Sequence, residues 1–437
     1  MIKTIGVVAD DTTGANDIGV MFRKNQYSVK IASYDEVNNF EVDSNVMIID
    51  TDSRLDSPDL SYEKVYKATK ALQKMDCSLY FNKTCSVFRG NIGKEFDAML
   101  DALGEEFAVI SLAFPKNGRQ TKNAIHTVYG KLLENSEFYH DPVHPMNQSN
   151  LVNILQGQTN RKVTFVDLET VRQGATVLRK AIEEKRKDFN YCIIDSESQA
   201  DLTIVAEAVH DYKVLAGSSA IAEELPKFMQ VQPINHSLTN LDITDDLGVL
   251  VVSGSLTPQT KAQTNTLISS GVPCVVLDSR NVFSPADCEK EVRRVFEEAQ
   301  LLLRQGKDIL IMANNREEVV LETKEMGLKR KIDPLTISKM VSAMLADVTG
   351  QIANATGLKR LIVAGGDTSG TVSRKLGIKG NYVLSEIETG LPSGLAVGRH
   401  MLIVLKSGSF GKPDFLVRAI AHLKELSIKK GTFVEKI

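Results

Sequence analysis

The sequence predicts an α/β protein of two domains, each a mainly parallel sheet with helices on both faces, with the active site in the interdomain cleft. Short runs rich in Val and Ile recur, each followed by a polar or glycine turn and a helical pattern, which is typical of parallel sheets covered on both faces. The 437 residues suit two or three domains of about 150 residues. Periodicity disappears over residues 231–246, where polar residues dominate. We therefore expect a domain at 1–230, a linker at 231–246 and a second domain at 247–437.

In the first domain, continuous apolar runs are expected to form buried strands. A carboxylate, hydroxyl or glycine follows each run, so polar groups should collect at one edge of the sheet, where open α/β sheets bind ligands. An apolar stripe at helical spacing, with Phe96 and Met99 on it, predicts a packed helix between two of the strands. The expected strands are Ile5–Ala9, Val46–Ile49, Leu79–Phe81, Ala108–Leu112, Tyr191–Ile194 and Val214–Ala216.

The second domain repeats this alternation. An apolar stripe from Val292 to Leu303 predicts a core-facing helix, and Gly306 is expected to cap its C-terminus. The expected strands are Leu247–Val252, Cys274–Leu277, Asp308–Ala313, Leu361–Ala364 and Met401–Leu405.

Composition argues against two classes of partner. The net charge is −3, aromatic residues make up 6% and Trp is absent, so neither a field that attracts nucleic acid or anionic membrane nor a base-stacking surface is expected. Five cysteines without a C-x-x-C pair fit reduced thiols rather than disulfides or a zinc site. No run is long enough to span a bilayer. We expect a cytoplasmic protein.

Glycine- and hydroxyl-rich loops follow several strands of the second domain. Their glycines let the backbone approach a ligand closely, and a helix N-terminus offers free N–H groups to phosphate. Thr368 and Ser369 are expected to cap the helix that follows one loop. Neither G-x-x-x-x-G-K-[ST] nor a strand followed by G-x-G-x-x-G is present, which argues against a P-loop NTPase and a dinucleotide-binding dehydrogenase. The loops, which predict a nucleotide site of another pattern, are Ser253–Ser255, Gly365–Gly370 and Lys406–Gly411.

Two carboxylates, Asp10 and Asp11, follow the first strand and precede a Thr-Thr-Gly turn. Adjacent carboxylates at a strand end can hold Mg²⁺, accept a hydrogen bond from a substrate hydroxyl or act as general base. The alternative is that one of them caps the next helix while the other faces solvent.

A second polar segment follows the strand at Leu79–Phe81. Its side chains include Lys83, Ser86, Arg89 and Asn91, and such donors suit a small anionic, hydroxylated ligand because guanidinium binds carboxylate bidentately. For any one of these residues, a surface ion pair is the alternative.

These motifs resemble the four-carbon acid sugar kinases, in the family's order and over essentially the whole chain. The resemblance implies an ATP-dependent kinase acting on a terminal hydroxyl of threonate, erythronate or 3-oxo-tetronate, with the acid sugar on the N-terminal domain and ATP on the C-terminal domain. The matching segments are Ala9–Ala15 (A-D-D-x-T-G-A), Asp52–Arg54 (D-x-R), Phe114–Thr121 (F-P-x-x-G-R-x-T), Ser253–Ser255 (S-G-S), Gly365–Ser369 (G-G-D-T-S) and Leu405–Gly411 (L-K-S-G-x-F-G).

One position departs from the family's K-x-D-S-T-L-R-G-N pattern, because Cys85 stands where that pattern has Asp. The resemblance links Cys at this position to the 3-oxo-tetronate branch, whereas Arg89-Gly90-Asn91 resembles the threonate and erythronate branches. The loss of a carboxylate leaves Asp10 and Asp11 as the acceptors of a hydroxyl proton. Cys85 is expected to pack as a small residue, since kinase chemistry needs no thiolate.

The expected site residues fall into three groups. Asp10 or Asp11 is the expected catalytic base, and Arg54 or Arg89 is expected to bind the substrate carboxylate. The acid-sugar site is expected to comprise Asp11, Arg54, Lys83, Thr84, Cys85, Ser86, Arg89, Gly90 and Asn91. ATP with Mg²⁺ is expected at Ser253, Ser255, Gly365, Gly366, Asp367, Thr368, Lys406, Gly408 and Gly411. The sequence identifies no metal ligands.

Three other interpretations stay open at this point. An NAD(P)-dependent oxidoreductase acting on small hydroxy acids is an alternative, although the dinucleotide fingerprint is missing. A binding protein that closes on a sugar acid without catalysis is another, and loops with a purely structural role are the third. The partners expected are a small acid sugar and ATP, without nucleic acid or membrane, and the sequence is compatible with a homo-oligomer.

Overall fold

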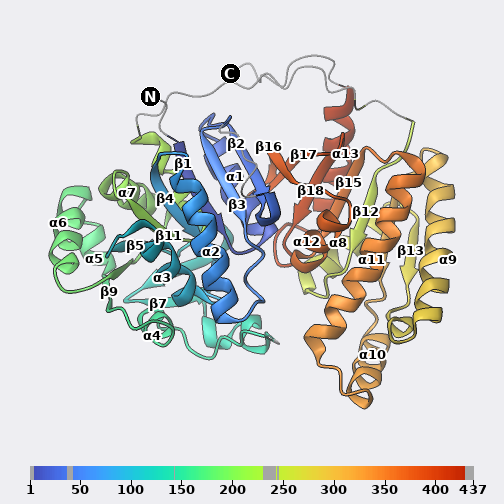
Figure 1. Ribbon diagram of the computed structural model, residues 1–437, viewed down its shortest axis with the longest axis horizontal. Coiled ribbons are helices and arrows are strands. Elements are labelled where there is room, and N and C mark those ends of the chain that lie inside the picture. Colours follow the sequence, from blue (N-terminus) through green and yellow to red (C-terminus); the bar gives the residue numbers. More distant parts are fainter. Residues whose placement is uncertain (1–3, 37–42, 142, 230–242, 244–245, 429–437) are drawn as a thin grey trace. The chain divides into compact units, whose positions relative to one another are not determined.

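The computed structural model describes residues 4–36, 43–141, 143–229, 243 and 246–428. The chain forms two compact units, Met1–Asn235 and His236–Ile437, and each is described by itself (Figure 1). Apart from Ile243 and Asp246, the predicted linker at 231–246 lies outside the described residues.

The N-terminal unit is built on a parallel sheet with strand order β2-β3-β1-β4-β11-β5-β10-β9. All of its neighbouring strands pair in parallel, as continuous apolar runs predict. The strands are β1 (Thr4–Ala9), β2 (Val29–Ser33), β3 (Val46–Asp50), β4 (Cys77–Lys83), β5 (Ala108–Ser111), β9 (Val163–Val166), β10 (Tyr191–Ile194) and β11 (Val214–Gly217).

Helices connect these strands. Helices α2 and α3 pack on one face, where Val65 and Phe96 meet the strand residues Val8 and Ile49 in one buried cluster. A separate antiparallel sheet, β6-β7-β8, is inserted after β5. The elements are α1 (Thr12–Arg23), α2 (Pro58–Gln73), α3 (Ile92–Leu103), α4 (Leu151–Gln156), α5 (Leu168–Val171), α6 (Ala175–Arg186) and α7 (Gln199–Val209), with β6 (Arg119–Lys122), β7 (Ile125–Val128) and β8 (Lys131–Leu132).

The chain changes direction at β1 and β4, which are neighbours in this sheet. From β1 the chain passes through α1 towards β2 on one side, whereas from β4 it passes through α3 towards β5 on the other. Such a point opens a crevice at the carboxyl ends of the two strands, and ligands bind there in open α/β sheets.

The C-terminal unit contains a mixed sheet with strand order β13-β14-β12-β15-β18-β17-β16. The strands from β13 to β18 in this order are parallel, and a β16–β17 hairpin adds antiparallel strands at one side. The strands are β12 (Leu250–Ser253), β13 (Cys274–Leu277), β14 (Ile309–Ala313), β15 (Arg360–Ala364), β16 (Gly380–Glu388), β17 (Leu391–Val397) and β18 (Leu402–Lys406).

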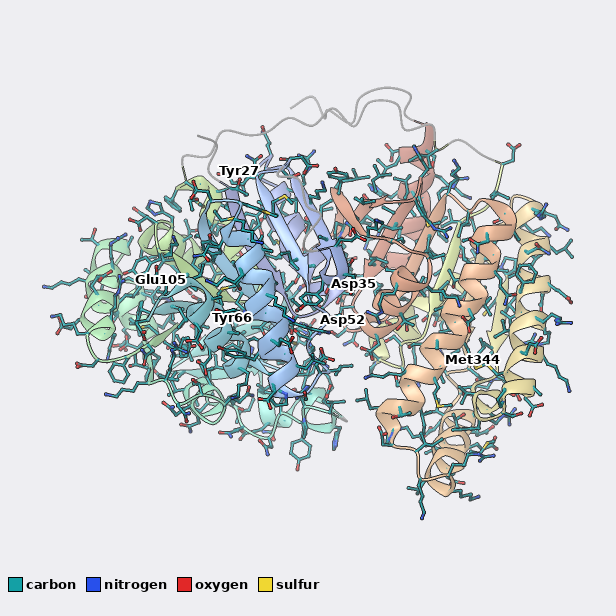
Figure 2. The ribbon with its side chains drawn as sticks, in the orientation of Figure 1. Tyr27, Asp35, Asp52, Tyr66, Glu105 and Met344 are labelled. Carbon is teal, nitrogen blue, oxygen red and sulfur yellow. The ribbon has the colours of Figure 1, made fainter. Side chains whose placement is uncertain are left out.

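Both faces of this sheet are buried, because successive residues of β12 belong to two different hydrophobic clusters. Leu250 and Val252 join a cluster that includes Met344 of α11, which is labelled in Figure 2. Val251 joins a second cluster that includes Leu416 of α13. The helices are α8 (Pro258–Ser269), α9 (Pro285–Arg304), α10 (Glu317–Lys329), α11 (Pro334–Thr356), α12 (Gly366–Lys375) and α13 (Phe415–Ile428).

The direction changes again between β12 and β15. From β12 the chain passes through α8 to β13, and from β15 it passes through α12 to the opposite side of the sheet. In the described part of the chain, no helix is both long enough and apolar enough to cross a membrane.

Candidate active site

Asp10 and Asp11 follow β1 and introduce α1. Asp11 is the N-cap of that helix, since its Oδ1 accepts the Gly14 N–H at 2.5 Å and its Oδ2 accepts the Thr13 hydroxyl at 3.1 Å. The capping alternative is therefore correct for Asp11. The partner of the Asp10 carboxylate is Arg54, so Asp10 does not face solvent.

Arg54 binds both aspartates through three nitrogens. Its Nε and Nη2 donate to the two Asp10 oxygens at 2.7 Å each, and its Nη1 donates to Asp11 Oδ2. The side chain of Asp10 is 1% exposed and that of Asp11 is 13% exposed. Burial raises the pKa of the Asp11 carboxyl, but Arg54 and Lys83 outweigh it and hold that pKa below its ordinary value.

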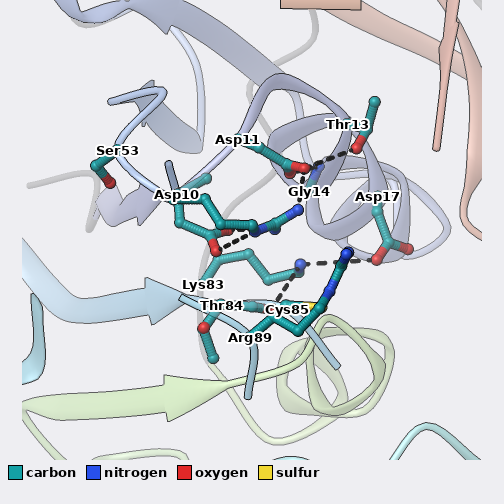
Figure 3. A network of polar contacts seen from close by, with 12 residues as sticks. Asp10, Asp11, Thr13, Gly14, Asp17, Ser53, Lys83, Thr84, Cys85 and Arg89 are labelled. Atoms are coloured by element: carbon teal, nitrogen blue, oxygen red, sulfur yellow. Dashed lines mark hydrogen bonds and ion pairs between the residues drawn. The ribbon is translucent and has the colours of Figure 1, made fainter. Parts of the chain in front are cut away.

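Lys83 ends β4, beside the end of β1. Its ammonium donates to the Thr84 carbonyl at 3.0 Å and lies 3.8 Å from Asp17 Oδ2, which also accepts the Ser219 hydroxyl. Figure 3 shows these contacts beside the two aspartates. Lys83 is 3% exposed, so it is a buried cation and not part of a solvated surface pair.

The loop after β4 places Arg89 against Cys85. The Arg89 Nε approaches the Cys85 Sγ at 3.4 Å, and its Nη1 donates to Asp141 at 2.6 Å. Cys85 packs in the hydrophobic core of the unit. Burial disfavours the thiolate, but Arg89 and Arg54 together lower the pKa of Cys85 below its ordinary value.

Two glycines are required where these side chains meet. A Cβ on Gly14 would lie 2.6 Å from Asp11 Oδ1 and 3.0 Å from the Lys83 Nζ. Gly90 has φ +114°, a conformation that side chains rarely adopt, and a Cβ there would approach Arg54. The close packing explains glycine at both positions.

The remaining predicted acid-sugar residues differ in their surroundings. The Thr84 hydroxyl is buried without a hydrogen-bond partner in the described structure. The Ser86 hydroxyl likewise donates to no described residue, and Ser86 is 9% exposed. The Asn91 amide, by contrast, donates to the Asp56 carbonyl at 2.9 Å and so supports the loop that carries Arg54.

Two buried acids beneath the site escaped the sequence analysis. Glu95 of α3 is 1% exposed and accepts the hydroxyls of Ser53 and Ser61 at 2.7 and 2.6 Å. Burial raises its pKa to about 8. Asp50 accepts the Thr12 hydroxyl at 2.5 Å, and burial raises its pKa to about 7. Glu95 occupies a helix, and no local pattern distinguishes it from a solvent-facing glutamate.

In the C-terminal unit, the three predicted loops lie at adjacent strand ends. Ser253 pairs with Ala364 in one ladder, and Ala364 pairs with Lys406 in the next. The loops also touch, because a Cβ on Gly254 would meet the Thr368 hydroxyl at 2.3 Å and one on Gly408 would meet the Ser255 hydroxyl at 2.5 Å.

The helix after β15 begins earlier than the sequence analysis predicts. Gly365 is the N-cap of α12, and the helix starts at Gly366. Thr368 and Ser369 lie inside its first turn, so the prediction that they cap it was wrong. Gly365 makes no side-chain cap hydrogen bond to this turn, and the N-terminus of a helix is suited to binding an anion.

Lys406 ends β18 and is 0% exposed. Its ammonium donates to the Thr260 hydroxyl at 3.0 Å, and it makes no ion pair among the described residues. Burial lowers its pKa to about 7. The C-terminal site thus holds a buried lysine that makes no ion pair among the described residues, beside glycine loops and a helix N-terminus.

No group of three or more His, Cys, Asp or Glu that could hold a metal ion occurs among the described residues.

Comparison with known proteins identifies the class of enzyme. Residues 5–225 match a family described as a sugar-binding N-terminal domain, and residues 250–416 match a nucleotide-binding C-terminal domain. The chain belongs to this two-domain family, that of the four-carbon acid sugar kinases, and it is a carbohydrate kinase.

Several curated relatives carry the name 3-oxo-tetronate kinase. The chain is 31% identical to that of Pseudomonas savastanoi pv. phaseolicola over 432 residues, covering 96% of this chain and 97% of the relative. It is 30% identical to that of Burkholderia multivorans, over the same shares of both chains. The Haemophilus influenzae relative is 27% identical and covers 94% of this chain and 98% of its own.

Solved structures agree with this fold. A Salmonella typhimurium LT2 protein, provisionally described as a tRNA synthase, has a TM-score of 0.80 at 25% identity, covering 95% of this chain and 98% of that one. A Haemophilus influenzae protein from a family of unknown function has a TM-score of 0.71 at 27% identity, covering 95% and 99%.

Proposed function

We propose that the protein is an ATP-dependent kinase that phosphorylates the terminal hydroxyl of a four-carbon acid sugar. The observation that supports this most directly is a buried lysine at the end of a parallel strand in each sheet. Lys83 lies beside the carboxylates of Asp11 and Asp17 in one unit, whereas Lys406 makes no ion pair among the described residues of the other. The first setting suits a ligand with both hydroxyls and a carboxylate, and the second suits phosphate.

Arg89 is the better candidate to bind the substrate carboxylate. All three nitrogen atoms of the Arg54 guanidinium already donate to Asp10 and Asp11. Arg89 uses Nε and Nη1, and its Nη2 has no acceptor among the described residues. Arg54 then serves to hold the two aspartates in place.

Asp11 is the better candidate for the base. Its side chain is 13% exposed, against 1% for Asp10, so a substrate hydroxyl can reach it more easily. The lowered pKa of Asp11 makes it a weak base. That suffices in phosphoryl transfer, where a loose transition state leaves the proton on the attacking oxygen until late and positioning matters most.

Among acid sugars, 3-oxo-tetronate is the first to test, because it is the substrate that the relatives' names specify. Cys85 in place of a carboxylate supports the same choice, since it removes one hydroxyl acceptor from the site. Threonate and erythronate remain in the proposal through Arg89-Gly90-Asn91.

ATP fits the C-terminal unit by the chemistry of its donors: the buried Lys406, the Ser255 hydroxyl and the N-terminus of α12. Mg²⁺ would neutralise phosphate charge during transfer. Because no acidic cluster is present among the described residues, its ligands would come largely from the phosphates and water.

The proposal is tested by measuring ADP release from ATP over a panel of four- and five-carbon acid sugars, each with and without Mg²⁺. One tetronate should accelerate ADP release far above the rate with ATP alone, and only with Mg²⁺ present. If no acid sugar accelerates ADP release, the proposed substrate class is wrong.

A further inference from the structure

Helix α8 binds the carbonyl groups of the loop that follows β18. The Thr257 and Thr260 hydroxyls both donate to the Gly408 carbonyl, at 2.6 and 2.8 Å. One turn further along, the Gln263 amide donates to the carbonyls of Phe410 and Gly411, at 2.9 and 2.8 Å. Three of the loop's carbonyl oxygens are thus turned towards one polar face of this helix.

The N–H groups of the same loop have no such partners. Within the described chain, the backbone N–H groups of Gly408, Ser409 and Gly411 donate to no acceptor, and these residues are partly exposed. A carbonyl oxygen repels a phosphate, whereas an N–H group binds it. A loop whose carbonyls are bound elsewhere and whose N–H groups are free is suited to an anion.

Thr260 has a second contact with the site, because its hydroxyl accepts the Lys406 ammonium at 3.0 Å. The only other described acceptor of that ammonium is the Gly408 carbonyl at 3.5 Å. Thr260 and Gln263 are both 0% exposed, so neither can be a peripheral contact. The Thr260 hydroxyl therefore links the buried lysine to the loop.

We propose that Thr260 and Gln263 are positioning residues for nucleotide binding: they turn the carbonyls of the Lys406–Gly411 loop away from the phosphates and hold the Lys406 ammonium in place. This inference rests on the proposed function of the C-terminal unit. Neither residue lies in the sequence segments on which the resemblance to the kinase family rests, and each acts through the loop and not by contact with substrate.

The test uses the full chain with MgADP as the probe and a matched pair of variants. Thr260→Val keeps the shape of the side chain and removes the hydroxyl, whereas Thr260→Ser keeps the hydroxyl. The loss of one or two hydrogen bonds should raise the MgADP Kd of Thr260→Val by about tenfold, with Thr260→Ser close to wild type. The KM for the acid sugar should not change in either variant.

A double-mutant cycle with Lys406→Met separates this role from a merely structural one. Because part of the effect passes through the lysine, Thr260→Val should weaken MgADP binding less in the Lys406→Met background. The inference would be overturned if Thr260→Val lowered MgADP affinity equally in the wild-type and Lys406→Met backgrounds. It would also be overturned if Thr260→Val and wild type had equal Kd values for MgADP. Wild-type protein that binds no MgADP would instead contradict the proposed function.

Amide hydrogen exchange of the wild-type protein provides a measurement that does not depend on how a variant folds. MgADP should slow exchange at Gly408, Ser409 and Gly411, because phosphate oxygens then accept their N–H groups. Unchanged exchange at all three while MgADP is bound would show that this loop does not bind the phosphates.

Discussion

Replacing Arg54 with Met tests the central ion cluster of the N-terminal unit. The guanidinium makes two hydrogen bonds of 2.7 Å to Asp10 and a further one to Asp11. Without it, Asp10, whose side chain is 1% exposed, becomes a buried carboxylate that has lost its hydrogen-bonded ion-pair partner. Breaking a buried ion pair in this way costs about 3–5 kcal/mol.

We therefore expect Arg54→Met to lower the free energy of unfolding of this unit at pH 7 by about 3–5 kcal/mol. With an m-value of about 2 kcal/mol per molar urea, the midpoint should fall by about 2 M. Tyrosine fluorescence can follow the transition: the chain lacks Trp, and nine of its ten tyrosines precede residue 235, Tyr382 being the exception.

The pH dependence gives the sign of the effect. The folded-state pKa of Asp11 lies below the ordinary value of 3.8, so this ion pair stabilises the fold above about pH 4 and is lost as the pH falls through the folded pKa. The difference in the free energy of unfolding between wild type and Arg54→Met should be largest at pH 7 and should decrease below pH 4.

Two controls complete the experiment. Arg54→Lys keeps the charge but loses the bidentate geometry of the guanidinium, so its urea midpoint should lie between those of wild type and Arg54→Met. Asp10→Asn combined with Arg54→Met removes the unpaired charge and should recover part of the loss. A double variant as unstable as Arg54→Met, or an unchanged midpoint in Arg54→Met at pH 7, would refute the reasoning.

The remaining predictions concern single residues. Asp11→Asn should lower kcat by about 10²- to 10⁴-fold with little change in the KM for ATP; steady-state ADP release measures both, and an unchanged kcat would exclude Asp11 as the base. Glu95→Gln keeps the acceptor for Ser53 and Ser61 and removes an acid whose pKa is raised to about 8. Because the folded protein favours the protonated form of Glu95, the protonated acid stabilises the fold at low pH, and this stabilisation is lost as the pH rises from about 4.5 through 8. Thermal unfolding should accordingly show the variant more stable than wild type at pH 9, and no such gain at pH 9 would contradict the buried acid. For Lys406, whose pKa is lowered to about 7 with Glu388 as the facing carboxylate, nucleotide-free protein should gain stability between about pH 7 and 10.5. MgADP affinity should fall over the same pH range as the ammonium loses its proton. Urea titrations measure the stability and calorimetry measures the affinity, and Lys406→Met should abolish the pH dependence of both.

Most of the parallel strands could be predicted from sequence, because strands buried on both faces form continuous apolar runs. Tyr191–Ile194 and Cys274–Leu277 match β10 and β13 at both ends. Three features were not among the expected strands: β2, whose sequence VKIAS carries a lysine, the short strand β9, and the β16–β17 hairpin, whose strands contain Pro, Gly and Ser. Antiparallel strands of mixed composition give weak periodicity.

The site was predictable where backbone geometry follows from residue type. Polar residues after parallel strands must share one edge of the sheet, so Asp10 and Lys83 could be expected to meet. The ion pairs of Arg54 with Asp10 and Asp11 could not be predicted, because they depend on the distance between the loops that follow β1 and β3. Thr260 and Gln263 were missed for a similar reason: their partners lie some 150 residues away, as with Thr260 and Gly408, and threonine or glutamine in a helix carries no local signal.

Each unit contains a complete sheet with its own switch point and its own buried lysine. Under the proposed function, mutations around Cys85 would therefore alter which sugar acid is accepted without disturbing the loops at Gly365 and Lys406. In such a chain, substrate specificity can change through mutations in the N-terminal unit while the nucleotide-binding C-terminal unit stays the same. Chimaeras that exchange the first 230 residues between relatives are the natural means of reassigning specificity.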